Sequence, residues 1–351
     1  MGLWKVVVSA PYARPCMPRY REVLERAGCD VIDACATERL EEDELIELLP
    51  GVHGIICGDD RISARVLEAA TDLQVISKWG TGIDSIDGAE ARRRGIVVCN
   101  TPDAFSEPVA DTVMGYTLIA ARQLDRMNAE MHDGSWRKPQ LRSLGEQTLG
   151  IVGVGNCGRA VARRAAAFRL RILGTDIVEI PASVRHETGL TQVPLAALLR
   201  ESDVVSLNCT LNPTSFHLIN AEALALMKSS AFLINTCRGP VVDEPALEDA
   251  LISRRLAGAA LDVFEHEPLP RDSRLRSLAN CWLAPHNANS SVVAAERVHE
   301  RTLRSLLDVL RGTRSTEDEL DAPAFQIAPD PSEIAGSDRS KPGTAEGLRL
   351  A

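Results

Sequence analysis

Short apolar runs, many of them β-branched, alternate along the chain with segments in which apolar residues recur at helical spacing. Over the first hundred residues, the runs predict strands at 5–9, 30–33, 54–57, 73–77 and 96–99. The segments between them predict helices at 19–27, 41–49, 64–70 and 86–94. Parallel strands need long crossover connections, usually helices, so this alternation predicts an α/β fold with parallel sheets.

A second series of the same kind follows a long helical stretch at 108–131 and a polar segment at 132–147. Its apolar runs predict strands at 150–154, 171–175, 203–207, 231–236, 259–263 and 281–284. This count is that of a complete doubly wound dinucleotide-binding domain. A final amphipathic segment at 292–310 predicts one more helix. Together the two series predict two doubly wound parallel-sheet domains.

The last segment, 313–351, differs in kind from the rest of the chain. It is rich in Pro, Ser and Gly and poor in bulky apolar residues, so it is predicted to be a disordered tail. A compact regulatory domain is the alternative, but the segment has neither a pair of amphipathic helices nor a run of strands.

Composition narrows the possible partners. The length of 351 residues agrees with about two domains, and 45% hydrophobic residues suffice for substantial cores. The formal net charge of −10 argues against binding to nucleic acid or to anionic lipid. Any anionic ligand would therefore need a local basic site.

The cysteines and the most apolar stretch bear on the cellular compartment. Nine cysteines without a CxxC pair argue against a disulfide framework or a structural metal site and favour reduced thiols in the cytoplasm. The N-terminus has no export signal. The most apolar stretch, 112–121, has about half of the ~20 residues that a membrane span requires. We therefore expect a cytoplasmic protein that is not inserted in a membrane.

A glycine motif opens the second series. The run at 150–154 leads into GxGxxG, formed by Gly153, Gly155 and Gly158, and a helical segment follows at 159–168. In such a motif the first glycine allows a tight turn and the second lets the backbone approach a pyrophosphate. The third lets the helix pack closely on the strand. Strand, turn and helix in this order predict a dinucleotide-binding loop.

An acidic residue supports this interpretation and selects between two cofactors. Asp176 follows the next predicted strand, where a carboxylate accepts hydrogen bonds from the adenosine ribose hydroxyls. The same carboxylate would repel a 2′-phosphate. NAD is therefore favoured over NADP.

Three further segments, 235–244, 261–269 and 284–287, each follow a predicted strand. In a doubly wound sheet, ligands bind outside the carboxyl ends of the strands. An arginine, a carboxylate and a histidine from these segments are thus expected to converge beside the cofactor. Each of these residues alone would more often be an ordinary surface or loop residue.

These motifs and their order resemble the NAD-dependent D-isomer-specific 2-hydroxyacid dehydrogenases, within them the phosphoglycerate dehydrogenase-like branch. The resemblance covers about residues 3–312. It also rests on 78–87 (KWGTGIDSID), 99–102 (CNTP) and 108–111 (PVAD).

The resemblance implies three catalytic residues. Arg238 corresponds to the substrate-binding arginine, Glu267 to the carboxylate partner and His286 to the acid/base. Arg238 would grip the carboxylate of a 2-oxo acid, while His286 protonates the developing alkoxide as NADH delivers hydride. Glu267 would orient the ring of His286 and favour its charged form.

The resemblance also implies the binding residues. It places cofactor contacts at Thr81, Gly153, Gly155, Asn156, Cys157, Gly158, Asp176, Cys209, Thr210, Thr236, Cys237, Arg238 and Asp262. It places substrate contacts at Lys78, Trp79, Gly80, Thr81, Gly82 and Arg238. Lys78 either supplies positive charge for a second anionic group of the substrate or is simply a lysine at a strand end. Asn287 and Asn289 either influence substrate choice or cap the following helix.

The family's architecture implies an interrupted domain. A Rossmann NAD-binding domain at 101–289 would be inserted into a flavodoxin-like substrate domain formed by 1–100 and 290–312. The active site would lie in the cleft between them, with hinges near residues 100 and 290. Relatives are usually homodimers built on the cofactor domain, and the segment 132–147 is a candidate for that contact.

The function implied is hydride transfer between NAD(H) and a 2-hydroxy acid/2-oxo acid pair, of the phosphoglycerate dehydrogenase or the hydroxypyruvate/glyoxylate reductase kind. One alternative is an NADH-responsive, corepressor-like binding protein on the same fold, because such relatives retain the same catalytic residues. A third possibility, a phosphite-type substrate, is disfavoured because Thr81 stands where that branch carries lysine.

Overall fold

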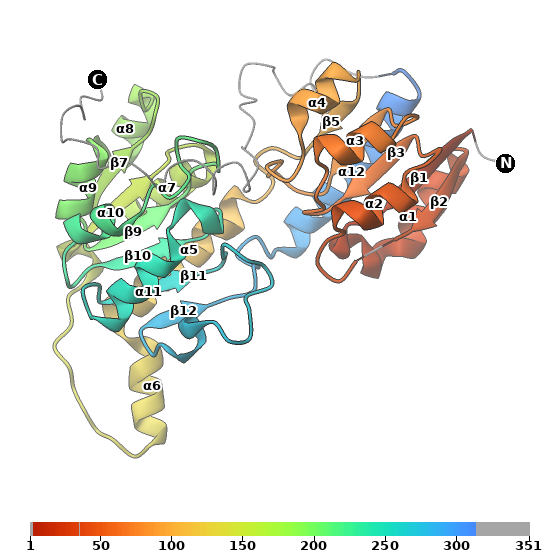
Figure 1. Cartoon of the computed structure of the whole chain (residues 1–351). Coiled ribbons are helices and arrows are strands. Elements are labelled where there is room, and N and C mark those ends of the chain that lie inside the picture. Colours follow the sequence, from red (N-terminus) through yellow and green to blue (C-terminus); the bar gives the residue numbers. More distant parts are fainter. Residues whose placement is uncertain (1–2, 35, 314–351) are drawn as a thin grey trace, which may run out of the picture.

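The structure, a computed structural model, describes residues 3–34 and 36–313. The predicted disordered tail therefore lies outside the described residues from position 314 onward. Two parallel sheets with their helices lie beside each other and are joined by a narrow connection (Figure 1). The predicted α/β fold class with two parallel sheets is confirmed.

The first sheet has five parallel strands in the order β2-β1-β3-β4-β5. This is the flavodoxin-like order. The strands are β1 (Trp4–Val8), β2 (Cys29–Asp33), β3 (Gly54–Cys57), β4 (Val75–Lys78) and β5 (Val97–Cys99). Its connections contain a 3₁₀ helix, η1 (Pro11–Cys16), and the helices α1 (Met17–Arg26), α2 (Glu42–Leu48), α3 (Ala64–Ala69) and α4 (Gly88–Arg93).

Both faces of this sheet are buried, which explains why its strands are continuous apolar runs. Val6 and Val8 point into a core shared with α1 and the last helix, α12 (Val292–Leu310). Val7, between them, points into the opposite core, which α2 and α3 cover. Helix α12 is tied to the sheet by a hydrogen bond from Ser77 Oγ to the carbonyl of Thr302, at 2.8 Å.

The second sheet has seven parallel strands in the order β12-β11-β10-β9-β6-β7-β8. Reading outward from β6, this is the Rossmann arrangement extended by β12. The strands are β6 (Thr148–Val152), β7 (Arg171–Thr175), β8 (Thr191–Gln192), β9 (Val204–Leu207), β10 (Phe232–Asn235), β11 (Gly258–Leu261) and β12 (Cys281–Leu283). Its helices are α7 (Asn156–Ala167), α8 (Ala182–Thr188), α9 (Leu195–Glu201), α10 (Ala221–Leu226) and α11 (Glu244–Ile252), and three 3₁₀ turns are η2 (Leu144–Glu146), η3 (Gly239–Val241) and η4 (Arg274–Ser277).

The single helix predicted at 108–131 is two helices, α5 (Ser106–Arg122) and α6 (Leu124–His132). The break falls at Gln123, whose φ of 47° is left-handed and ends the helical path. Helix α5 packs against α7, whereas α6 buries none of its residues and extends away from the second sheet with the loop that follows it (Figure 1).

The start of α12 corrects the expectation about Asn287 and Asn289 as helix caps. Ser291 is the cap, because its side-chain oxygen accepts a hydrogen bond from the amide of Ala294 at 3.3 Å. The two asparagines precede this cap in the loop that leads out of β12.

Within 3–34 and 36–313, no helix combines the length and the hydropathy that a membrane span requires.

Candidate active site

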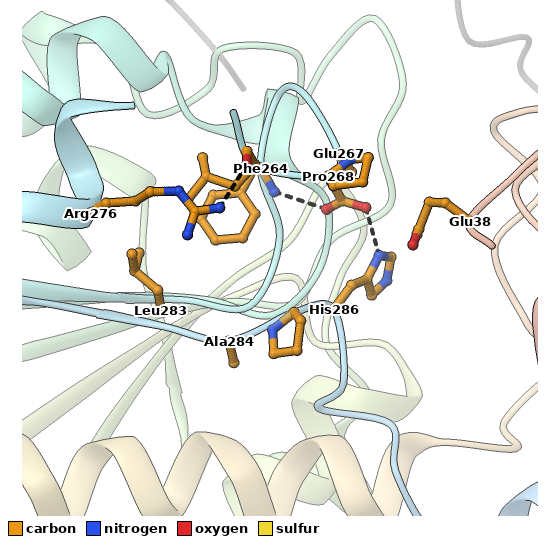
Figure 2. A pocket seen from close by; sticks show the side chains of 10 residues that line it. Glu38, Phe264, Glu267, Pro268, Arg276, Leu283, Ala284 and His286 are labelled. Carbon is orange, nitrogen blue, oxygen red and sulfur yellow. Dashed lines mark hydrogen bonds and ion pairs between the residues drawn. The ribbon is translucent and has the colours of Figure 1, made fainter. Parts of the chain in front are cut away.

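His286 and Glu267 form a hydrogen-bonded pair on the loops that follow β12 and β11. Glu267 Oε2 lies 2.8 Å from Nδ1 of His286, and its other oxygen accepts a hydrogen bond from the amide of Phe264 at 2.9 Å (Figure 2). Both side chains line one cavity of about 280 Å³. Because Nδ1 is engaged by Glu267, Nε2 is the ring nitrogen that can exchange a proton with a ligand.

The surroundings of His286 favour its protonated form. Burial by itself lowers the pKa of His286, but the hydrogen bond from the ring to Glu267 and the charge of that carboxylate outweigh it. The pKa of His286 is therefore raised, although the positive charge of Arg238 opposes the shift. A raised pKa makes the ring a better-populated proton donor near neutral pH.

Asp262 holds the loop that carries His286. The backbone amide of His286 donates to the carbonyl of Asp262 at 2.8 Å. The amides of Asn287 and Ala288 donate to its two carboxylate oxygens, each also at 2.8 Å. This buried carboxylate thus fixes the left-handed turn at His286, where φ is 47°. The predicted contact of Asp262 with the cofactor stays a prediction.

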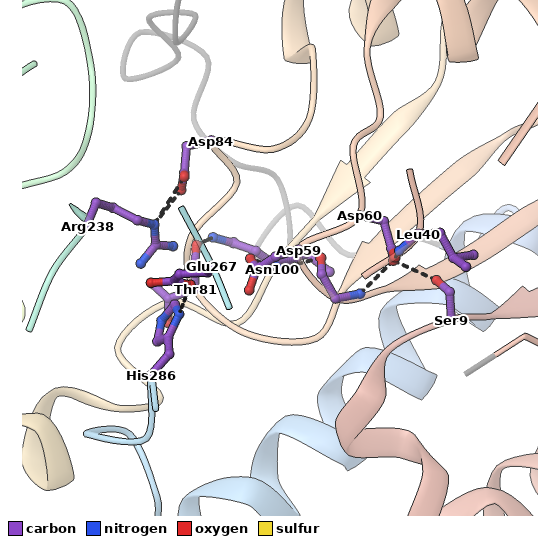
Figure 3. A network of polar contacts seen from close by, with 12 residues as sticks. Ser9, Leu40, Asp59, Asp60, Thr81, Asp84, Asn100, Arg238, Glu267 and His286 are labelled. Carbon is purple, nitrogen blue, oxygen red and sulfur yellow. Dashed lines mark hydrogen bonds and ion pairs between the residues drawn. The ribbon is translucent and has the colours of Figure 1, made fainter. Parts of the chain in front are cut away.

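Arg238 connects the two sheets. It follows β10, and its Nε donates to both carboxylate oxygens of Asp84, at 2.9 and 3.1 Å, on the loop that follows β4 (Figure 3). The Asp84 charge raises the pKa of Arg238 above its already high ordinary value. One terminal nitrogen also donates to the carbonyl of Cys237 at 2.8 Å. Within the described residues, the hydrogen bonds of Arg238 engage Nε and Nη1, which leaves the second terminal nitrogen, Nη2, able to bind a ligand carboxylate.

The segment predicted to bind substrate runs beside this guanidinium. A Cβ built on Gly82 would overlap Nη2 of Arg238, so only glycine leaves room for the side chain. Gly80 has a φ of +125°, which disfavours any other residue there. Thr81 donates its hydroxyl to the carbonyl of Thr101 at 2.9 Å, which ties the segment to the connection between the sheets. The structure therefore brings Gly82, at the end of this segment, and Arg238 together.

Lys78 is buried and paired with a carboxylate of the protein. Its side chain is 3% exposed, and its ammonium donates to Asp59 Oδ1 at 2.6 Å and to the carbonyl of Gly58. Burial works against the charged form of Asp59, but Lys78 and then Arg238 lower the pKa of Asp59 well below its ordinary value. Lys78 is therefore already paired with a carboxylate.

The glycine loop has the shape that a dinucleotide requires. Gly153 has a φ of +85°, and a Cβ there would meet the backbone of Cys209 at 2.7 Å. Gly155 faces open space, directly before α7 begins at Asn156. Gly158 lies so close to the carbonyl of Gly153 that a side chain would collide with it. The amides at the start of α7 are thus accessible to a pyrophosphate.

Other predicted cofactor residues surround this loop. Asp176 Oδ2 accepts a hydrogen bond from the amide of Val154 at 2.7 Å, so the acid also holds the glycine loop. The hydroxyl of Thr236 and the amide oxygen of Asn208 are buried without a partner among the described residues. Buried polar atoms need partners, and the hydroxyls and carboxamide of NAD would supply them. The residues present therefore fit NAD.

Three thiols lie at the same edge of the sheet. Cys209 and Cys237 interact through their side chains, and Cys237 Sγ also lies 3.1 Å from the side-chain oxygen of Asn235. Cys157 Sγ lies 3.6 Å from Ser106 Oγ, where α7 meets α5. Thr210 contributes its carbonyl, which accepts a hydrogen bond from Ser215 Oγ at 2.6 Å.

Sequence reasoning did not single out Asp84, Asp59 or Glu38. Asp59 follows β3 almost directly, so the rule that ligands bind at the carboxyl ends of parallel strands could have indicated it. Glu38 lies on an irregular loop after β2 and carries no motif. It nevertheless faces His286 across the cavity (Figure 2).

Comparison with known proteins agrees with this geometry. Residues 114–288 match the family D-isomer specific 2-hydroxyacid dehydrogenase, NAD binding domain. The chain is 41% identical to a glyoxylate reductase of Korarchaeum cryptofilum over 282 residues, which are 78% of this chain and 82% of that protein. It is 38% identical to a hydroxypyruvate reductase of Thermotoga maritima, covering 75% of this chain and 86% of the relative.

Similarity extends to a longer enzyme and to a solved structure. Human D-3-phosphoglycerate dehydrogenase is 35% identical, with 90% of this chain and 58% of that enzyme covered. A crystal structure of D-lactate dehydrogenase from Aquifex aeolicus, complexed with NAD and lactic acid, aligns with a TM-score of 0.80 at 27% identity, covering 88% of this chain and 96% of the other.

The two sheets, the glycine loop and the paired histidine and carboxylate define a dinucleotide-dependent oxidoreductase. The chain belongs to the D-isomer-specific 2-hydroxyacid dehydrogenase family and is an NAD-dependent enzyme of that family. The predicted resemblance, enzyme class and cofactor are confirmed. These comparisons give no support for the corepressor-like alternative.

Proposed function

We propose that this chain reduces a small 2-oxo acid to the 2-hydroxy acid with NADH, and that Arg238, Glu267 and His286 carry the reaction. The 2.8 Å contact between Glu267 and His286, in a cavity close to Arg238, is the observation that carries the proposal. Glyoxylate and hydroxypyruvate are the first substrates to consider, because reductases of these acids are similar over most of the chain.

Arg238 would bind and polarise the substrate. Asp84 holds the guanidinium by its Nε edge, which leaves Nη2 for the substrate carboxylate and the neighbouring carbonyl oxygen. The backbone of 80–82 comes close to Nη2 of Arg238 at Gly82. The amides of this segment are therefore suited to bind the same substrate carboxylate. Two anchors would fix the position of the reacting carbon.

His286 would act as the general acid in reduction and as the general base in oxidation. With Nδ1 engaged by Glu267, its Nε2 donates a proton to the carbonyl oxygen as charge develops there. Bound NADH supplies the hydride. In the oxidative direction, Nε2 accepts the hydroxyl proton, and Glu267 stabilises the resulting imidazolium.

The cofactor would lie along α7 and the ends of β7, β9 and β10. The amides of Asn156 and Cys157 would meet the pyrophosphate, and Asp176 the adenosine ribose hydroxyls. Thr236 and Cys237, which follow β10, and Cys209 with Thr210, which follow β9, would line the remaining length. Thr81 would approach the cofactor from the other sheet.

We propose the domain division 1–100 with 290–312 for the substrate domain, and 101–289 for the NAD-binding domain. The return of α12 to the first sheet supports it. The chain crosses between the sheets near both boundaries, which supports hinges of cleft closure near residues 100 and 290.

We also propose a homodimer in the cytoplasm. Helix α6 exposes Leu124 and Met131, and Trp136 on the following loop is 75% exposed. Apolar side chains on a projecting arm favour burial against a second copy. Light scattering should give twice the monomer mass for the wild-type protein. Replacing Trp136 by a charged residue should lower the measured mass toward that of the monomer. The eight cysteines among the described residues are free thiols, which fits a reducing compartment.

The activity test is NADH oxidation with glyoxylate, hydroxypyruvate and phosphohydroxypyruvate, followed by absorbance. Turnover of at least one 2-oxo acid is expected. Failure of all three, in a preparation that binds NADH tightly, would contradict the proposal. His286→Ala serves as the matched control for contaminating reductases.

A further inference from the structure

Two cavities that share Glu38 lie beside the paired His286 and Glu267. The larger one contains His286 and Glu267 and extends across to Glu38. The smaller one, of about 120 Å³, is lined by Pro11, Tyr12, Thr37, Glu38 and Asp59. Glu38 lines both cavities, and all five residues of the smaller one come from connections of the first sheet.

The polar atoms of this second pocket are mostly carboxylate oxygens. Glu38 is half-buried and points toward His286 (Figure 2). The side chain of Asp59 is 43% exposed, whereas the lysine that neutralises it is almost completely covered. A substrate side chain would therefore meet the carboxylates of Glu38 and Asp59 and could not reach the ammonium of Lys78.

A fully buried residue, Asp60, holds the two acidic loops together. One of its carboxylate oxygens accepts a hydrogen bond from the amide of Leu40 at 2.6 Å. The other accepts from Ser9 Oγ at 2.7 Å and from the amide of Gly58 at 3.0 Å (Figure 3). The loop of Glu38 is thus connected to the loop of Asp59 by buried hydrogen bonds. These two carboxylates, which we call the acidic wall, are therefore held in place by the fold.

Aromatic packing fixes the remaining side of the pocket. Tyr12 stacks on Trp79 with ring centroids 4.3 Å apart. Trp79 donates its indole N–H to Nδ1 of buried His299, on α12, at 3.0 Å. This stacking therefore holds the ring of Tyr12, which lines the smaller pocket, against Trp79.

One arginine lines the larger cavity, on the side opposite Glu38. Arg276 comes from the segment between β11 and β12, and it donates Nε to the carbonyl of Pro270 at 2.9 Å and Nη2 to that of Leu269 at 2.7 Å. The cavity between Arg276 and His286 is lined by apolar residues such as Phe264 and Leu283 (Figure 2). Arg276 therefore does not offset the carboxylates of the smaller pocket.

We propose that Glu38 and Asp59 set the substrate class: a 2-oxo acid whose side chain donates hydrogen bonds and bears no negative charge, such as a hydroxyl or a cationic group. A phosphorylated side chain would bring its negative charge against two carboxylates, and none of the five described residues that line the smaller pocket is a cation, so such a side chain is rejected. This inference rests on the proposed function, because it names the substrates of the same cleft.

The test compares substrate side chains that differ in charge and in hydrogen-bond donors in the wild-type enzyme. Hydroxypyruvate should exceed phosphohydroxypyruvate in kcat/KM by ~10²-fold or more, and 2-oxobutanoate, which lacks the donor, by ~10-fold. A guanidinium-bearing 2-oxo acid should be accepted, which distinguishes a cationic side chain from a hydroxyl. Equal or higher kcat/KM for phosphohydroxypyruvate would overturn the inference.

Charge-only variants identify the residues responsible. The double substitution Glu38→Gln with Asp59→Asn removes both negative charges and leaves Lys78 positive. The ratio of kcat/KM for hydroxypyruvate to kcat/KM for phosphohydroxypyruvate should therefore fall by ~10-fold or more. Glu38→Gln alone should give part of this effect. Glu47→Gln, an exposed position on α2, removes the same charge outside the cavities and should keep the wild-type ratio. An unchanged ratio in the double variant would assign the selectivity elsewhere.

A binding measurement separates this inference from the proposed function. Calorimetry on NAD-loaded protein should show tighter binding of D-glycerate than of 3-phosphoglycerate, whether or not the chain turns over a given 2-oxo acid. Absence of turnover with this preference intact would count against the proposed function alone. Tighter binding of the phosphorylated acid would overturn the acidic wall as a selector.

Discussion

Arg238 and Asp84 form an ion pair between the two sheets, with Nε 2.9 and 3.1 Å from the two carboxylate oxygens. The pair aims the guanidinium from one side while Gly82 leaves room for it on the other. An arginine held in this way presents its donors in one orientation, so less ordering is left for the binding step.

Asp84→Asn should therefore weaken substrate use without weakening cofactor binding. The amide can accept only one hydrogen bond from Nε and carries no charge, so Arg238 loses its alignment. We expect kcat/KM for the 2-oxo acid to fall ~10- to 100-fold, mostly through KM. NADH affinity, measured by fluorescence, should stay near the wild-type value. Asp84→Glu should retain part of the activity. Equal losses in kcat/KM and in NADH affinity in Asp84→Asn would indicate a folding defect instead.

His286→Ala should remove the proton donor and leave NADH binding intact. Loss of general acid catalysis typically costs ~10²- to 10⁴-fold in turnover. Steady-state rates with purified variant, beside NADH titration, check this. His266→Ala, in the loop that carries Glu267, is the matched histidine control. Turnover of His286→Ala close to wild type would remove His286 from its proposed role.

Glu267→Gln should move the pH profile of reduction to lower pH. Reduction needs protonated His286, so its rate falls as the pH rises through the pKa of that ring. Glu267 raises this pKa through its hydrogen bond and charge. The uncharged amide lowers it, and the alkaline fall in kcat/KM should then begin at lower pH. The oxidative reaction, which needs the neutral ring, should extend to lower pH in the same variant.

Gly82→Ala should act on the substrate side alone. Its methyl group would displace Nη2 of Arg238, so KM for the 2-oxo acid should rise ~10-fold or more while NADH affinity changes little. Gly115→Ala, on α5, has no atom within 4 Å of the added carbon and should be neutral or slightly stabilising. A Gly82→Ala enzyme with unchanged KM would contradict the close approach of Arg238 to this backbone.

Asp176→Ala should weaken NADH binding and reduce the preference for NADH over NADPH. The substitution removes the acceptor for the amide of Val154 and the charge that repels a 2′-phosphate. We expect the ratio of kcat/KM between the two cofactors to shift ~10-fold or more toward NADPH. If both cofactors lose affinity equally, Asp176 supports the loop and does not select the cofactor.

Much of the fold follows from the sequence because both sheets are buried on both faces. Their strands appear as continuous apolar runs, and all but one of the strands were predictable. The exception, β8, has only the two residues Thr191–Gln192 and leaves no run to detect. The break between α5 and α6 was missed because Gln123 adopts a left-handed conformation with neither glycine nor proline to signal it.

The site was predictable only where a strand end positions the residue. Arg238, Glu267 and His286 follow strands of one sheet, so their proximity follows from the topology. Asp84 shares its loop with Asp87, and nothing in the sequence tells which one faces the cleft. In the structure, Asp87 caps α4 by accepting the amide of Glu90, while Asp84 meets Arg238 across the connection. Such a contact between sheets has no signature in either segment.

The contact between Trp79 and His299 connects the last helix to the wall of the proposed side-chain pocket. An indole N–H can only donate, so Nδ1 of His299 is an acceptor and the ring is neutral, which agrees with its pKa being lowered by burial. Because Tyr12 rests on Trp79, an exchange at position 299 would tilt the pocket wall without touching any pocket residue. If the proposed pocket selects the substrate, α12 therefore belongs with the loops it supports among the positions to vary in a redesign.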